Sequence, residues 1–170
     1  LDIEFKRLTG RRGPGAGRPT KLYKRSAAQF EVTLPERHYD LAGRLMAEAI
    51  EDSARTGQPV VGALHAAAAE FGAMLGAQAG DRADSPADES RRLSTVCDLL
   101  EAHGYEPRLE DRRVTLLNCP FHLLAQEHTE LVCGMNLALL SAAARQAGND
   151  LLTAALDPAP DRCCVVLTVA

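Results

Sequence analysis

Apolar residues recur at helical spacing in four long segments of this 170-residue chain. Pro35 suits the first turn of a helix over residues 35–56, and Gly57-Gln58-Pro59 ends it. Residues 60–79 predict a second helix, built almost entirely of small apolar residues. The same spacing predicts helices over 88–103 and from about 130 to 147, with a short helix or turn over 121–125 between them. The apolar face of the first helix consists of Tyr39, Leu41, Ala42, Leu45, Met46, Ala49 and Ile50.

Shorter segments have the composition of β-strands. Residues 3–10 and 22–26 predict a hairpin around the Gly/Pro-rich stretch RRGPGAGRPTK. Residues 105–109 and 113–117 predict a second hairpin, and 151–157 and 162–169 predict the last two strands, joined by a turn. The pattern indicates an α+β fold, in which an N-terminal β-hairpin and two helices precede a domain of order α-β-β-α-β-β with an antiparallel sheet.

A polar segment, GDRADSPADE, separates the second and third helices and is typical of a linker. We therefore expect three regions. Residues 1–34 hold the hairpin, 35–80 form a helical linker or dimerisation region, and 88–170 form a compact C-terminal domain.

Charge is distributed unevenly along the chain, whose net charge is −4. Residues 1–25 carry eight basic and two acidic side chains, a net of +6, and the other residues carry 11 basic and 21 acidic, a net of −10. A basic end on an acidic body favours a polyanion contact confined to that end, or else a solvated basic terminus. The basic residues that can contact DNA phosphates or a narrow minor groove are Arg11, Arg12, Arg18 and Lys21.

The five cysteines are the candidates for chemistry. Cys119 leaves a predicted strand, Cys133 lies near the start of a predicted helix, and Cys163 and Cys164 lie in the predicted last strand. Successive strand residues face opposite sides, so only one of Cys163 and Cys164 is expected to face a shared site. Cys97 falls on an apolar helical stripe and is expected to be a core side chain.

Composition and spacing leave the role of these cysteines open. Buried thiols are one interpretation, and a metal site at Cys119, Cys133 and Cys163 or Cys164 is another. His122 can complete a three-cysteine, one-histidine set that zinc accepts. No residue is evident to orient a base for a nucleophilic Cys119, so we do not expect an enzyme. No apolar run reaches the roughly 18 residues of a membrane span, and no signal peptide is evident, so we expect a cytoplasmic protein without membrane contact.

The segment GRRGPGAGRPTKLYKRS resembles the wing of winged helix-turn-helix regulators of the ArsR/DeoR-like type found in actinobacteria. The resemblance implies a double-stranded DNA partner and a homodimer. It also implies that the chain starts just past the recognition helix, so that the helix-turn-helix itself is absent. A wing alone mostly contacts the DNA backbone.

The segment NCPFHLLAQEHTELVCGMNLALL, followed by a late cysteine, resembles the C-terminal domain of SufR-type regulators. The resemblance implies a transcriptional regulator whose iron–sulfur cluster is bound at Cys119, at Cys133 and at Cys164 or Cys163, with Cys164 favoured. Zinc is the alternative cofactor. The alternative function is a regulator with structural zinc, or with no metal, that responds to a small ligand.

Overall fold

The structure is a computed structural model that describes residues 2–6, 14, 18–24, 34–80 and 88–170. It consists of two compact units, Leu1–Val32 and Thr33–Ala170, each of which is described by itself. The fold is mixed α+β with antiparallel sheets, as the sequence predicts.

The first unit contains the expected hairpin. Strand β1 (Asp2–Lys6) pairs antiparallel with β2 (Thr20–Lys24), and Ile3 lies opposite Tyr23. Strand β1 begins one residue before the predicted start and β2 begins two residues before it, while residues 7–10, 25 and 26 of the predicted strands lie outside the described residues. Ile3, Phe5 and Tyr23 share one face of the hairpin and are more than half exposed.

The second unit begins with two helices. Helix α1 (Tyr39–Thr56) starts four residues later than predicted, because the segment before it is held by other contacts. The His38 N–H donates to Pro120 O at 3.1 Å, which fixes this segment against the loop that follows β4. Helix α1 ends at Gly57, whose φ of 77° is the left-handed conformation that glycine adopts without cost. Helix α2 (Val60–Gly80) follows the predicted range.

The rest of the unit has the predicted element order. Helix α3 (Glu89–Glu101) is capped by Asp88, whose carboxylate accepts from the Arg91 N–H at 3.0 Å. The remaining elements are β3 (Pro107–Glu110), β4 (Arg113–Leu116), α4 (His122–Glu127), α5 (Thr129–Gly148), β5 (Leu152–Leu156) and β6 (Val165–Val169). The four strands form one antiparallel sheet in the order β3-β4-β6-β5. Cys97 on α3 packs against the core, as predicted.

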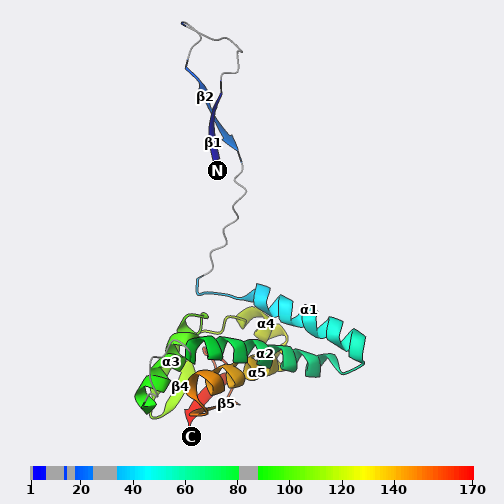
Figure 1. The fold of residues 1–170 in the computed structure, drawn as a ribbon, viewed down its shortest axis with the longest axis vertical. Coiled ribbons are helices and arrows are strands. Elements are labelled where there is room, and N and C mark those ends of the chain that lie inside the picture. The colour runs from blue at the N-terminus through cyan, green and yellow to red at the C-terminus, as the bar shows by residue number, and fades with distance from the viewer. Residues whose placement is uncertain (1, 7–13, 15–17, 25–33, 81–87) are drawn as a thin grey trace. The chain divides into compact units, whose positions relative to one another are not determined.

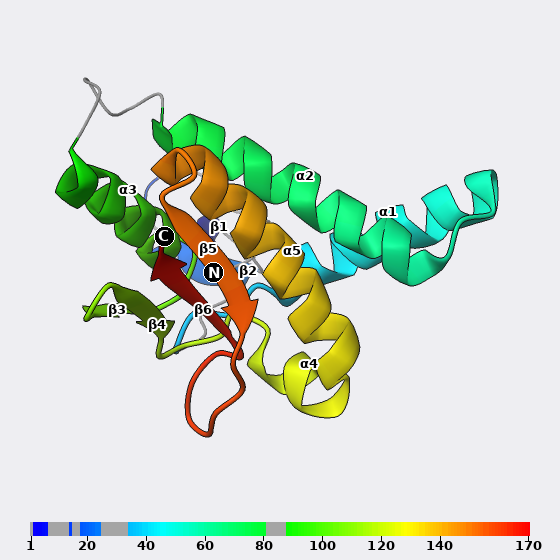
Figure 2. The same cartoon turned by 90° about the horizontal axis from the view of Figure 1, so that it is seen from below.

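Helix α5 is the central element of this unit. It packs on β5 and on α2, and α1 packs on α2. Figure 1 shows α2 and α5 side by side, and Figure 2 shows α5 between α2 and the two strands β5 and β6. The core therefore lies where α5 meets the sheet on one side and α2 on the other.

Small residues bring α2 and α5 close together. A Cβ atom at Gly72 would overlap the carbonyl oxygen of Leu139, and one at Gly76 would overlap that of Ala143. Because both contacts advance by four residues on each helix, the two helices run in the same direction.

By length and composition, α2 is apolar enough to cross a membrane, contrary to the sequence expectation, although buried core helices pass the same test.

The close packing of α2 on α5 joins two of the three regions that the sequence predicts. Residues 35–80 lie in the same compact unit as 88–170, because the glycine face of α2 fits α5 of this same chain. Residues 81–87, where the boundary was expected, lie outside the described residues.

Candidate cysteine site

Four of the five cysteines line one cavity of about 290 Å³. Cys119 lies in the loop between β4 and α4, Cys133 lies in the second turn of α5, and Cys163 and Cys164 precede β6. We call these four residues the cysteine site. Three segments that are distant in sequence thus bring their sulfurs to one place, while Cys97 stays outside.

The adjacent Cys163 and Cys164 both line the cavity, which corrects a prediction. The last strand begins at Val165 and not at residue 162, so the two cysteines are not in a regular strand and do not alternate. The preceding turn contains Asp161 at a φ of 59°, a left-handed conformation. The chain then enters the sheet irregularly, with the Cys163 N–H donating to Leu116 O at 2.8 Å.

Cys133 and Cys164 form a disulfide. Their Cα atoms are 6.4 Å apart, and 31 residues separate them in sequence. The bond ties the start of α5 to the segment before β6. Neither the spacing of the cysteines nor the resemblance indicated this pairing.

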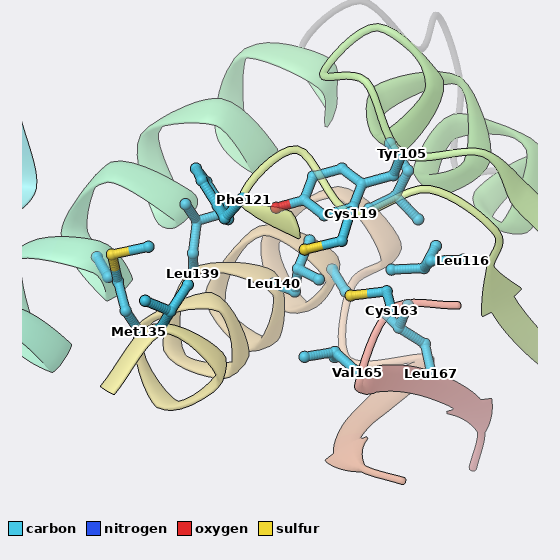
Figure 3. Packing of buried hydrophobic residues seen from close by; sticks show 14 of the residues in the cluster. Tyr105, Leu116, Cys119, Phe121, Met135, Leu139, Leu140, Cys163, Val165 and Leu167 are labelled. Carbon is cyan, nitrogen blue, oxygen red and sulfur yellow. The ribbon is translucent and has the colours of Figure 1, made fainter. Parts of the chain in front are cut away.

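Cys119 and Cys163 form the second sulfur pair, and Figure 3 shows their side chains beside each other. The hydrogen bond from Cys163 lowers the pKa of Cys119, with help from the Phe121 N–H and the Arg37 guanidinium, while burial opposes the shift. The same bond raises the pKa of Cys163 far above its ordinary value, and burial adds to the rise. Within this pair, Cys163 donates the hydrogen bond and Cys119 is the sulfur that loses its proton more readily.

A buried polar chain supports Cys163. The Tyr105 hydroxyl donates to Asn136 Oδ1 at 2.6 Å, and Asn136 Nδ2 donates to Cys163 Sγ at 3.3 Å. Burial is the main cause that raises the pKa of Tyr105 well above its ordinary value, so this hydroxyl keeps its proton. The Asn136 amide thus donates to the Cys163 sulfur, which itself donates to Cys119.

A second set of polar contacts holds Cys119 in place. The Arg37 guanidinium donates to Cys119 O at 3.0 Å and to the Asn118 side chain. Asn118 in turn donates to Glu36 O at 3.2 Å and to Gly104 O. The segment before α1 thereby fixes the loop that carries Cys119.

Sequence reasoning missed Arg37, Tyr105, Asn118 and Asn136 as members of the site. Only Asn136 leaves a signal in the sequence. It is an amide within the apolar stripe of a helix, three residues after Cys133, and buried amides need hydrogen-bond partners. The contacts of the other three depend on the tertiary arrangement.

While the Cys133–Cys164 disulfide is formed, the residues predicted to bind a metal are not arranged to coordinate a metal ion. Two of the four sulfurs are bonded to each other, and Cys119 and Cys163 share a hydrogen bond. His122 lines the cavity but is exposed, and its Nε2 lies 3.1 Å from the Gln126 amide nitrogen. Within the described residues, no three histidine, cysteine or carboxylate side chains are grouped to hold a metal ion.

The predicted DNA-binding residues lie in the first unit. Arg18 and Lys21 are exposed, and Lys21 Nζ lies 5.1 Å from the centroid of the Tyr23 ring. Arg11 and Arg12 lie outside the described residues.

No family model, curated protein or solved structure matches this chain.

Proposed function

We propose that this chain is part of a homodimeric, DNA-binding transcriptional regulator that senses redox or iron–sulfur status through the cysteine site. The observation that carries this proposal is the convergence of Cys119, Cys133, Cys163 and Cys164 on one cavity. Structural thiols have no need to gather in this way, whereas a redox or cofactor site requires it.

The disulfide supports a redox role. Two electrons and two protons from a dithiol reductant convert the Cys133–Cys164 bond into two thiols, and the reductant becomes a disulfide. The bond connects α5 to the segment before β6, so its reduction removes a covalent link between these two segments. Such a local change can shift a regulator between two arrangements.

The reduced site has the donor atoms that an iron–sulfur cluster or zinc uses. It offers four sulfurs, where the sequence alone indicated three and a histidine. When bound, a cluster supplies a one-electron redox couple and a labile crosslink among these segments. With Cys164 as the third cysteine ligand, Cys163 is then the candidate for a fourth ligand in place of His122.

The DNA contact rests on the hairpin and its charge. Exposed Arg18 and Lys21 lie in a segment whose net charge is +6 on a chain of net charge −4. The resemblance to a wing supports contact with the phosphate backbone. Such contacts supply affinity, while base contacts supply sequence preference.

The test of the sensor site is the iron, sulfide and zinc content of protein purified without oxygen. We expect iron and sulfide in the wild type and in Cys97→Ser, and their loss in Cys133→Ser. Zinc in place of iron would make the site structural. Equal metal content in the two variants, or none in the wild type, would contradict the ligand assignment.

The test of the hairpin is binding to a random-sequence DNA duplex as a function of salt. We expect Arg18→Ala to weaken binding and to reduce the slope of log K against log salt by about one. Arg108→Ala is the matched control, because Arg108 is an exposed arginine on β3 in the other unit. If both variants bind like the wild type, the hairpin is not the DNA contact.

A further inference from the structure

A cavity of about 200 Å³ lies outside the cysteine site, against α1, α2 and α5. We call it the aromatic cavity, because Phe71, Tyr105 and Phe121 line it. The chain has only four phenylalanines, three tyrosines and no tryptophan. Three of these seven aromatic rings therefore surround one space, together with leucines of three helices.

The volume of the aromatic cavity limits its occupant. An apolar cavity of about 150 Å³ accepts a benzene molecule, whereas sites for drug-sized ligands are about 300–1,000 Å³. A cavity of about 200 Å³ fits one ring with a small substituent and excludes a nucleotide. A larger cavity of about 460 Å³ shares Leu75 and His103 with it and offers space beyond the ring.

The charges at the aromatic cavity favour a neutral occupant. Asp40 and Arg44 both line it and are exposed, and they lie one helical turn apart on α1. Their opposite charges cancel at short range, so neither an anion nor a cation gains from entering. The remaining lining is predominantly aliphatic and aromatic.

Hydrogen-bonding capacity in the cavity lies with two histidines. The Tyr105 hydroxyl is already donated to Asn136. His103 Nδ1 lies 2.8 Å from Leu99 O, so it carries the proton and leaves Nε2 as an acceptor. His38 Nε2 is buried and has no hydrogen bond to any described residue, although Glu36 Oε1 lies 3.3 Å away. A ligand that donates a hydrogen bond would use the acceptor Nε2 of His103, which favours a hydroxyl group.

We propose that the aromatic cavity binds a neutral, single-ring aromatic molecule with a hydroxyl group, a phenol, which packs against Phe71 and Phe121 and donates to His103. Phe121 follows Cys119 and Pro120 in the chain, so the occupant lies next to the segment that carries Cys119. The proposal does not rest on the cysteine site binding a metal or on the hairpin binding DNA.

The test uses two probes of nearly the same shape, 4-methylphenol and 1,4-dimethylbenzene, with binding to the intact chain measured by calorimetry. The wild type should bind 4-methylphenol saturably and about tenfold more tightly than 1,4-dimethylbenzene, because only the phenol donates a hydrogen bond. In His103→Leu the two probes should bind equally. Leu75→Phe fills the cavity and should abolish binding of both.

Leu123→Phe is the matched control, because Leu123 is exposed on α4 and does not line the cavity. It should bind both probes like the wild type. Circular dichroism checks that each variant is folded. If Leu75→Phe is unfolded, the comparison of the two probes in His103→Leu tests the proposal. The proposal is overturned if the wild type shows no saturable binding of 4-methylphenol at concentrations up to about 10 mM. It is equally overturned if the wild type binds the two probes with equal affinity.

Discussion

Replacement of Gly72 by alanine should destabilise the protein, although alanine is the better helix former. Gly72 is inside α2, and its Cα faces the backbone of α5. An added Cβ would overlap the carbonyl oxygen of Leu139, so one helix must move. This obstacle is backbone, which cannot rotate away as a side chain can.

Two opposing contributions set the magnitude. Gly→Ala in a helix interior stabilises by about 1 kcal/mol through helix propensity. Forcing a methyl group into a closely packed interface costs about 1–3 kcal/mol, and a backbone obstacle places this case at the upper end. We expect a net loss of about 1–2 kcal/mol in the free energy of unfolding. For a unit of this size, that loss lowers Tm by about 3–7 °C.

Gly43→Ala is the matched control. Gly43 is exposed in the interior of α1, and a Cβ there meets nothing within 4 Å. This substitution should raise the free energy of unfolding by about 0.5–1 kcal/mol. Urea unfolding followed by circular dichroism measures both variants. If Gly72→Ala stabilised the protein as Gly43→Ala does, the close packing of α2 on α5 would be refuted.

Two further predictions concern the cysteine site. Reduction of the Cys133–Cys164 disulfide should lower the free energy of unfolding by about 3–4 kcal/mol, because a loop spanning 31 residues is released. Urea unfolding with and without reductant measures this, and Cys133→Ser should be insensitive to reductant. Tyr105→Phe should cost about 1–3 kcal/mol, because Asn136 Oδ1 loses its donor while buried. An unchanged unfolding midpoint in Tyr105→Phe would show that the hydroxyl does not make this bond in solution.

The sequence predicted most of the secondary structure, because apolar spacing and turn residues depend only on neighbours along the chain. Apolar spacing placed α1, α2, α3 and α5 to within a few residues, since a helix repeats its burial every turn. The start of α1 was the largest helix error. Nothing in residues 35–38 indicates that the His38 N–H bonds to Pro120, which is 82 positions away in the chain.

The cysteine site also has members that the sequence indicated and features that only the tertiary structure shows. Cys119 and Cys133 were named from the sequence, because Cys119 leaves a predicted strand and Cys133 lies near the start of a predicted helix. The structure buries both side chains. The sequence did not indicate that Cys163 and Cys164 both face the cavity, because in the regular strand assumed there the two side chains point to opposite sides. The structure starts β6 two residues after Cys163, and so both sulfurs reach the cavity.

The sequence by itself determined the α+β class, the element order and the candidate cysteines, because these depend on neighbours along the chain. Only the tertiary structure decided which sulfurs pair, which polar groups orient them and where aromatic rings enclose a cavity. Those outcomes depend on segments such as 34–38, 103–105, 118–121 and 158–164, which meet only after α5 has packed between the sheet and α2. Contacts between residues so far apart in the chain leave no periodicity in the sequence.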